Sequence, residues 1–139
     1  MIVNKAVWNK DGHVSFGVEG GDGGSIYLKT KTIAVETLRL KDLIEKETFI
    51  DFLKLDIEGA ETEVLIDCQD VLGRVKNIFI EYHSFIGYPQ ALDKILYILS
   101  KNNFRYYFYP VSRDKSPAFS CKLGINIDFQ INIFAYKRQ

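Results

Sequence analysis

Two almost uninterrupted apolar segments constrain the fold of this chain more than any other feature of its sequence. They read FIDFLKLDI at residues 49–57 and NIFIEY at residues 77–82. Segments of this length and composition are typical of strands in a parallel sheet that is covered on both faces. We therefore expect residues 52–56 and 78–82 to form adjacent, parallel, central strands of one sheet.

Apolar residues at helical spacing follow each of these strands. The first stripe consists of Val64, Leu65, Cys68, Val71 and Leu72, and the second of Leu92, Ile95, Leu96 and Leu99. Pro89 suits the first turn of the second helix, and Asn102 and Asn103 suit its end. The alternation of strand and helix predicts an α/β fold in which both amphipathic helices cover the sheet.

The amino-terminal third is expected to be mostly extended. Residues 2–18 are interpreted as two strands around a turn that ends with Asp11 and Gly12. This pair favours a tight turn because glycine tolerates positive φ at no steric cost. Residues 33–38 are predicted to form a strand, which leads into a short helix at residues 39–47.

Residues 18–25 form a glycine-rich loop, VEGGDGGS. The strand-like residues 26–28 follow it, so no helix begins there whose free N–H groups could meet a ligand. We interpret the loop as the mobile end of a hairpin and not as a cofactor-binding loop.

The carboxyl-terminal end of the chain alternates apolar and polar residues. Residues 106–111 are expected to form one strand, and every second residue from 125 to 135 is apolar. The polar residues between them include Asn126, Asp128, Gln130 and Asn132. A period of two fits a half-exposed antiparallel strand. The expected fold is thus α/β, with parallel central strands and a carboxyl-terminal antiparallel hairpin.

Composition and charge exclude several classes of protein. The 139 residues fit one domain, and 47% hydrophobic residues suffice for a folded core. Eighteen basic and 18 acidic residues cancel, which gives no electrostatic case for nucleic acid or an anionic membrane as a partner. No segment is long and apolar enough to span a membrane, and the first residues do not resemble a signal peptide, so the cytoplasm is the expected location.

The two cysteines, Cys68 and Cys121, are too few for a disulfide framework. They also lack the paired spacing of a zinc site. Because Cys68 lies on the apolar stripe of the first helix, a buried thiol is expected there.

The residues that could carry chemistry gather where the two strands end. Asp56 and Glu58 follow the first strand in the segment DIEGAE, and ligands of open α/β sheets bind outside the carboxyl ends of the strands. Gly59 permits a tight turn and a close approach of the backbone. Glu61 falls in the first helical turn, where the helix dipole favours negative charge. The alternative interpretation is that these carboxylates only cap the helix.

Glu81 and His83 end the second strand. Residues two apart on a strand share a face, so both side chains are expected to point the same way and to lie beside Asp56. The separation of Asp56 and His83 should stay below about 15 Å, a few strand spacings. A histidine can serve as a general base or a metal ligand, although a lone histidine is more often structural.

Several segments of the sequence resemble a known family. KLDIEGAETEVL and IFIEYHSF resemble the FkbM family of methyltransferases, in which an Asp-x-Glu-Gly-Ala-Glu segment follows the fourth strand and a Glu-x-His-like segment follows the fifth. VETLRLKDLI, LYILSKNNFRYY and INIFAYK resemble flanking parts of the same family. The resemblance therefore covers nearly the whole chain.

The resemblance implies a Rossmann-like methyltransferase fold, with S-adenosylmethionine as methyl donor and a hydroxyl of a sugar or natural product as acceptor. It implies Asp56, Glu81 and His83 as catalytic residues, with Glu81 and His83 on the acceptor side. It also implies that Ala6, Asp56 and Glu58 bind the cofactor. Ala6, following the first strand, would lie near the adenine. No metal ligand is assigned in this interpretation.

The sequence departs from the family pattern in one respect. The family's glycine-rich loop, Asp-x-Gly-Ala-Asn-x-Gly, and the acidic residue that holds the ribose have no counterpart, so residues 1–139 resemble the carboxyl-terminal half of one domain. Two such losses, at about 1–3 kcal/mol each, predict weak or no cofactor binding by this chain alone. The exposed sheet edge is expected to be covered by another chain, by a second copy of this chain, or by a rearranged amino-terminal hairpin.

Three classes of function remain open. The chain could be the acceptor-side part of a methyltransferase that needs a partner, or a non-catalytic α/β module that acts through its exposed edge. The third class is an unrelated metal-dependent enzyme, in which Asp56, Glu58, Glu81 and His83 would be the oxygen and nitrogen ligands.

Overall fold

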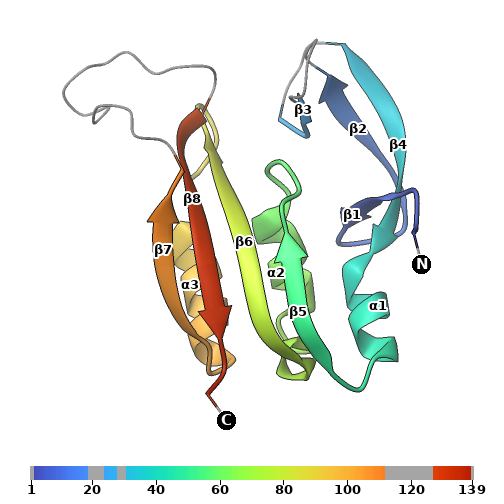
Figure 1. Cartoon of the computed structure of the whole chain (residues 1–139). Helices are drawn as coiled ribbons and strands as arrows, with labels where there is room; N and C mark the ends of the chain where they lie inside the picture. The colour runs from blue at the N-terminus through green and yellow to red at the C-terminus, as the bar shows by residue number, and fades with distance from the viewer. Residues whose placement is uncertain (1, 19–23, 28–30, 112–126, 139) are drawn as a thin grey trace, which may run out of the picture.

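The computed structural model describes residues 2–18, 24–27, 31–111 and 127–138 (Figure 1). Within these residues the chain forms two four-stranded sheets and three α-helices. In chain order the elements are β1 (Ala6–Trp8), β2 (Gly12–Val18), β3 (Gly24–Ser25), β4 (Thr32–Arg39), α1 (Leu40–Lys46), β5 (Ile50–Leu55), α2 (Glu61–Cys68), the 3₁₀ helix η1 (Leu72–Arg74), β6 (Val75–Phe85), α3 (Leu92–Lys101), β7 (Arg105–Pro110) and β8 (Ile127–Tyr136).

The two apolar runs form neighbouring parallel strands. Leu53 of β5 lies opposite Ile78 of β6, and Leu55 lies opposite Ile80. The sheet has the order β5-β6-β8-β7, and β8 is antiparallel to both of its neighbours. The predicted parallel pair and the predicted carboxyl-terminal antiparallel hairpin are therefore confirmed. The prediction that both parallel strands are central is wrong, because β5 lies at an edge of this sheet among the described residues.

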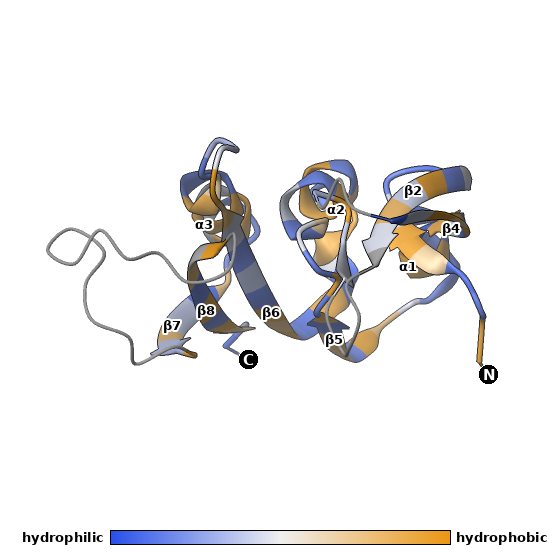
Figure 2. Cartoon of the chain, turned by 90° about the horizontal axis from the view of Figure 1, so that it is seen from above, coloured by the Kyte–Doolittle hydropathy of each residue, from blue (hydrophilic) through white to orange (hydrophobic). Residues whose placement is uncertain are grey.

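Helices α2 and α3 cover one face of this sheet, as both views show (Figures 1 and 2). The core beneath them contains Leu55, Ile78, Ile80 and Ile133, each no more than 1% exposed. The predicted helical stripes supply the other side of this core. Their buried members are Val64, Leu65, Cys68, Leu72, Ile95 and Leu99.

No helix of the described residues covers the opposite face. Phe52 on β5 is 58% exposed, and Tyr107 on β7 is 53% exposed. The ring of Phe134 lies between those of Phe79 and Tyr107, with ring centroids 5.0 and 5.1 Å away. The prediction of a sheet covered on both faces is wrong, because an apolar run does not distinguish a covered face from one whose aromatic rings pack side by side.

The amino-terminal sheet has the order β1-β4-β2-β3. β1 is parallel and β2 antiparallel to β4, so the two predicted strands of residues 2–18 flank β4 and do not pair with each other. The turn between them is fixed by Asp11, whose Oδ1 accepts a hydrogen bond from the backbone N–H of Arg39 at 2.9 Å. The strand and helix predicted at residues 33–38 and 39–47 are confirmed as β4 and α1.

The flanks of the glycine-rich loop pair as a hairpin, with Gly17 of β2 opposite Ser25 of β3. Residues 19–23, and with them the predicted mobility, lie outside the described residues. The strand predicted at residues 26–28 is wrong in its described part, because Ile26 and Tyr27 form a turn. The Ser25 hydroxyl accepts a hydrogen bond from the Tyr27 N–H at 3.2 Å, which bends the chain there.

Two smaller predictions have opposite outcomes. Cys68 is 1% exposed, which confirms the buried thiol, whereas Cys121 lies outside the described residues. Helix α3 begins at Leu92, so Pro89 lies in the preceding loop and not in the first turn. None of the helices in the described part of the chain is long and apolar enough to cross a membrane.

Candidate functional site

The turn between β5 and α2 has an unusual backbone. Glu58 has φ of 55° and Gly59 has φ of 103°. A Cβ atom on Gly59 would lie 2.8 Å from the ring of Tyr27 and 2.9 Å from the ring of Phe85. Glycine is required here by its conformation and by the lack of space, so the predicted tight turn and close approach are confirmed.

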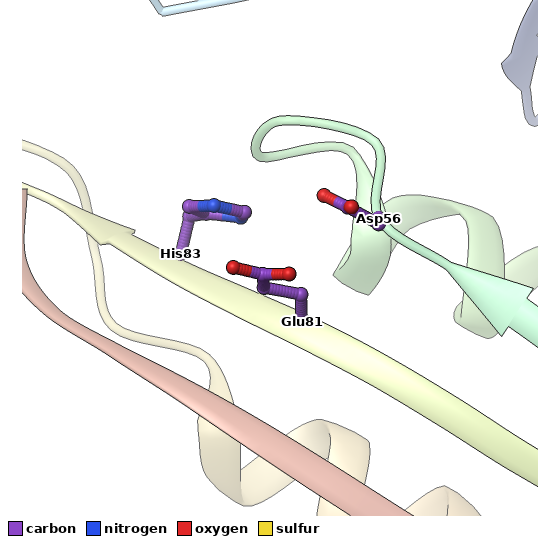
Figure 3. Close-up of side chains that lie close together, drawn as sticks. All are labelled: Asp56, Glu81 and His83. Atoms are coloured by element: carbon purple, nitrogen blue, oxygen red, sulfur yellow. The ribbon is translucent and has the colours of Figure 1, made fainter. Parts of the chain in front are cut away.

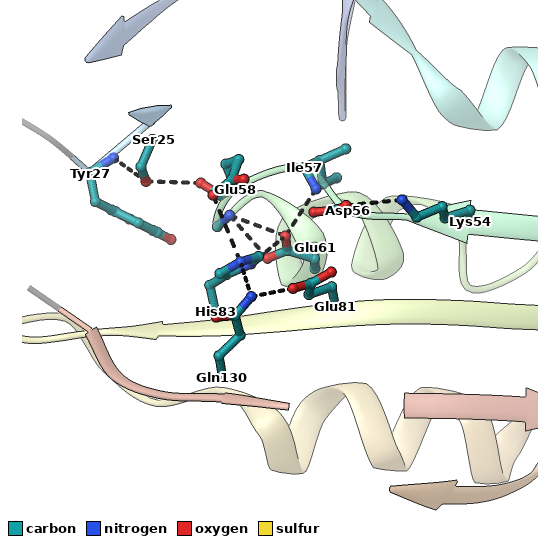
Figure 4. A network of polar contacts seen from close by, with 11 residues as sticks. Ser25, Tyr27, Lys54, Asp56, Ile57, Glu58, Glu61, Glu81, His83 and Gln130 are labelled. Atoms are coloured by element: carbon teal, nitrogen blue, oxygen red, sulfur yellow. Dashed lines mark hydrogen bonds and ion pairs between the residues drawn. The ribbon is translucent and has the colours of Figure 1, made fainter. Parts of the chain in front are cut away.

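Glu61 holds this turn from the first turn of α2. It is 1% exposed, and its carboxylate accepts hydrogen bonds from the N–H groups of Ile57 at 3.2 Å and Gly59 at 3.1 Å. The same carboxylate lies 3.3 Å from Nδ1 of His83 (Figure 4). Since the carboxylate serves as an acceptor for the backbone, it accepts from the protonated Nδ1 as well. Glu61 therefore connects the turn to the next strand and does more than respond to the helix dipole.

Glu81 and His83 point from the same face of β6, as predicted. Gln130 lies directly opposite His83 on β8. The side-chain amide of Gln130 donates a hydrogen bond to Glu81, and its Nε2 lies 3.1 Å from Nε2 of His83. Both ring nitrogens of His83 thus have a neighbour that fixes the orientation of the imidazole.

Asp56 completes the predicted cluster (Figure 3). Asp56, Glu81 and His83 each offer one ligand atom, and these atoms lie within 4.8 Å of one another. The distance is far below the expected upper limit, so the predicted clustering is confirmed. Asp56 is on the solvent side of the cluster, where its Oδ2 lies 3.0 Å from Nζ of Lys54. The catalytic roles assigned to these three residues remain predictions.

Carboxylates dominate the electrostatics around His83. Burial disfavours the charged imidazole, but the hydrogen bond to Glu61 and the nearby negative charges outweigh it, so the pKa of His83 is raised. Burial also raises the pKa of Glu58, and the neighbouring His83 opposes that effect. Glu58 Oε2 lies 3.7 Å from His83 Nε2. The site is therefore negative, and it favours a proton or another cation.

A cavity of about 290 Å³ lies next to the cluster, between the amino-terminal sheet and the β5–α2 turn. Ala6, Trp8, Phe16 and Ile26 line its apolar part, and Glu58 supplies a carboxylate. Ala6 lies within β1 and does not follow a strand, which corrects its predicted position. Two of the three predicted cofactor residues, Ala6 and Glu58, thus share this cavity, whereas Asp56 lies in the cluster.

A larger depression of about 870 Å³ lies elsewhere, over α2. Its lining includes Lys41, Asp67 and Asp70, and Lys41 Nζ already pairs with Asp70 at 2.6 Å. Ion pairs with such exposed partners leave little free charge to recognise a ligand. The cluster and its adjoining cavity are therefore the candidate functional site.

The sequence did not predict three contacts of this site. The hydroxyl of Ser25 donates a hydrogen bond to the backbone oxygen of Glu58 at 2.8 Å. The ring of Tyr27 packs against Phe85 with centroids 5.1 Å apart, and Gln130 bridges Glu81 and His83. The only sequence signal for Gln130 was its place in the period-two pattern, which predicted exposure and not a contact.

A comparison with protein families gives one match. The family model described as the methyltransferase FkbM domain matches residues 4–106, which include the β5–α2 turn and both residues on β6. The curated proteins and the solved structures contain no significant match to the chain.

Proposed function

The chain belongs to the FkbM methyltransferase family, and from this premise we propose that it takes part in methyl transfer from S-adenosylmethionine to the hydroxyl oxygen of a sugar or natural product. Methyltransferases of such a family generally use S-adenosylmethionine. The observation that carries the proposal is the cluster of Asp56, Glu81 and His83, which joins two strand ends beside a cavity.

The residues around the cavity fit the two chemical features of this donor. An adenine ring is flat and suits an apolar wall that contains Trp8 and Phe16. A sulfonium is a cation and suits the carboxylate of Glu58. When bound, the donor supplies an electrophilic methyl group. We propose that Ala6 and Glu58 contact the donor and that Asp56 lies between donor and acceptor.

The cluster fits the acceptor side of the reaction. In methyl transfer the acceptor oxygen forms a bond to the methyl carbon, the bond from that carbon to sulfur breaks, and the hydroxyl proton must leave. A position beside Asp56, Glu81 and His83 would orient the hydroxyl, and a carboxylate next to it would receive the proton. Glu61 supports this role because it fixes the His83 ring.

We also propose that this chain needs a partner for full activity. Among the described residues three strands lead into α-helices, at β4–α1, β5–α2 and β6–α3, and none of these connections is glycine-rich. In this part of the chain the proposed donor site therefore has no glycine-rich loop whose backbone N–H groups, at a helix N-terminus, could bind the donor. A second chain that carries such a loop would complete the donor site.

Trp8 provides a direct test of the donor site, because it is the single tryptophan of the chain and lines the cavity. Titration with S-adenosylmethionine should change its fluorescence. Glu58→Gln should weaken S-adenosylmethionine several-fold more than S-adenosylhomocysteine, whose sulfur carries no charge. Glu45→Gln, an exposed carboxylate on α1, is the control and should change neither titration. A Glu58→Gln protein in which both compounds are weakened equally, or neither is weakened, contradicts the donor site.

Activity is tested with methyl-labelled S-adenosylmethionine and a panel of sugar and polyphenol acceptors. Transfer to oxygen should occur, and Asp56→Asn or Glu81→Gln should lower it at least tenfold. Asp51→Asn, an exposed change of the same kind on β5, should not lower it. Transfer that is equal in all four proteins would show that the cluster is not the acceptor site.

A further inference from the structure

We propose that Asp56, Glu81 and His83 form a binding site for a divalent cation, Mn²⁺ or Mg²⁺, which holds the oxygen of the methyl acceptor. The proposal rests on the proposed function for its role in catalysis, but the site itself is argued from the geometry alone. Two carboxylates and one imidazole from adjacent strand ends converge on one point (Figure 3).

The separations fit a small cation. The three ligand atoms lie within 4.8 Å of one another. Ligands on opposite sides of an octahedral ion at about 2.1 Å from the metal lie about 4.2 Å apart. Small rotations of the exposed Asp56 and of the half-buried Glu81 side chains would close the difference. Oxygen-rich sets suit Mg²⁺ and Mn²⁺, and the single imidazole favours Mn²⁺.

His83 is oriented as a metal ligand. It is 6% exposed, and its Nδ1 donates to the carboxylate of Glu61 at 3.3 Å. A histidine that donates one ring N–H to a buried carboxylate presents the lone pair of its other nitrogen, which is the usual arrangement behind a metal-bound imidazole. Nε2 of His83 lies 3.1 Å from the amide nitrogen of Gln130, and in the neutral tautomer with its proton on Nδ1 it accepts from this amide.

Gln130 marks the position of the cation. Its side-chain amide contacts Glu81 and His83 at once, and both are residues of the proposed ligand set. An amide N–H₂ group offers positive hydrogens to two acceptors, as a cation would. A rotation of the amide would release these atoms and could present its own oxygen to the ion.

Asn132, on the strand beside Glu81, has an acceptor atom without a donor in the described part of the chain. Its Oδ1 is buried and has no hydrogen-bond partner among the described residues. Asn132 lies directly opposite Glu81, on the face of β8 that also carries Gln130. A buried acceptor without a partner is unfavourable, because it has lost its contacts with water and gained no donor. A water molecule bound to Mn²⁺ or Mg²⁺ is a donor, and these ions usually keep several waters.

The cation would act on the acceptor hydroxyl. When bound, the cation would act as a Lewis acid on this hydroxyl, which would ease the departure of its proton. The proton would pass to Glu58, whose Oε2 lies 3.7 Å from His83 Nε2 but which is not one of the three ligands. The oxygen then forms its bond to the methyl carbon as the bond to sulfur breaks.

The site is tested by titrating the protein with Mn²⁺ alone and measuring the concentration of free Mn²⁺ by electron paramagnetic resonance. One Mn²⁺ should bind per chain, and Mg²⁺ should compete. Asp56→Asn and Glu81→Gln should each weaken binding at least tenfold, and Glu61→Gln should weaken it through the orientation of His83. Asp51→Asn removes an exposed carboxylate of β5 outside the cluster and should leave binding unchanged. Circular dichroism establishes that each variant is folded; Asp56 is exposed, so Asp56→Asn provides a test in a folded protein.

The outcomes separate the site from the proposed function, because Mn²⁺ binding is measured without donor or acceptor. The cation site is overturned if Mn²⁺ stays free at 1 mM protein. It is also overturned if Asp51→Asn weakens Mn²⁺ binding as much as the changes at Asp56 and Glu81 do. Methyl transfer that persists undiminished in excess chelator overturns its catalytic role and leaves the proposed function standing. Specific Mn²⁺ binding without transfer to any acceptor supports the site and counts against the proposed function.

Discussion

At the scale of single residues, Glu61 decides the shape of the site. Three groups from two elements depend on its carboxylate: two backbone N–H groups of the β5–α2 turn and the ring of His83. Asp56 and Glu58 have more exposed side chains. The least exposed acid of the DIEGAE segment is therefore structural, and the exposed acids of this segment are free to meet ligands.

Glu61→Gln should lower the free energy of unfolding by about 1–3 kcal/mol. The carboxylate accepts hydrogen bonds from backbone N–H groups, whereas the NH₂ group of the amide cannot accept them. The measurement is equilibrium unfolding in urea. Glu63→Gln, an exposed change two residues along α2, should alter the free energy of unfolding by less than about 0.5 kcal/mol. Equal effects of the two changes would contradict the role given to Glu61.

Cys68 should be unreactive in the folded protein. Burial, with a smaller contribution from Asp67, raises the pKa of its thiol to about 12. Because the folded-state pKa is the higher one, the folded state retains this proton more strongly, and the associated stability is complete below about pH 9 and is lost as the pH rises towards 12. Peptide mapping after iodoacetamide treatment at pH 8 should find Cys68 unmodified in buffer and modified in urea. Equal modification in both conditions would contradict the burial.

At the scale of elements, the connections between strands and helices position the side chains of the candidate site. The β5–α2 turn presents Asp56 and Glu58, and the long strand β6 extends beyond the end of β5 to present Glu81 and His83. β8 adds Gln130 from the antiparallel side. The site is thus built from three neighbouring strands, and only the first two of them could be recognised from their sequence motifs.

Gly59→Ala tests the geometry of this turn. The variant should lose about 2 kcal/mol or more, because the positive φ costs about 1–2 kcal/mol and the new Cβ would also meet the rings of Tyr27 and Phe85. Gly73→Ala is the matched control, since a Cβ there meets nothing within 4 Å. Thermal unfolding of both variants measures the difference. A Gly59→Ala protein as stable as Gly73→Ala would show that the turn can relax.

The edge strand β5 predicts self-association. Among the described residues β5 pairs with β6 alone, and Phe52 on it is 58% exposed. A lysine on an edge strand opposes pairing with another chain. Phe52→Lys should therefore shift the protein towards the monomer in sedimentation equilibrium. Tyr97→Lys, at a residue 65% exposed on α3, should not. A wild-type protein that is monomeric at high concentration would refute the prediction.

At the scale of the whole molecule, the amino-terminal sheet and the β5–α2 turn border the proposed donor cavity, which is small. Its volume of about 290 Å³ is at the lower end of the range for small-molecule sites. β1 and β2 supply most of its apolar wall, and the β5–α2 turn supplies Glu58. The amino-terminal sheet is therefore more than a remnant beside the α/β unit, because it forms one side of the site.

Calorimetry of the isolated chain with S-adenosylmethionine should show a dissociation constant of hundreds of micromolar or weaker. Two missing sets of hydrogen bonds at about 1–3 kcal/mol each correspond to a loss of at least about 25-fold, since 1.4 kcal/mol is tenfold. The carboxylate of Glu58 is too exposed to compensate. Low-micromolar binding of one molecule per monomer would contradict this prediction and would mean that the amino-terminal sheet completes the donor site.

The sequence by itself determined the parallel pair, the helices that follow its strands, and the meeting of Asp56, Glu81 and His83. These features are local or follow from one rule: parallel strands end at the same edge, so the residues after them converge. The period of two in residues 125–135 likewise determined the antiparallel strand, because the apolar residues mark the face that is buried.

Only the tertiary structure decided the edge position of β5, the uncovered aromatic face, and the contacts of Ser25, Glu61 and Gln130. Strand order and the pairing of β1 and β2 with β4 depend on contacts between residues far apart in the chain. A pattern of apolar and polar residues predicts whether a side chain is buried or exposed. It does not predict which residue that side chain contacts. Gln130 looks like any polar residue of an alternating strand, and it becomes part of the site because β8 lies beside β6.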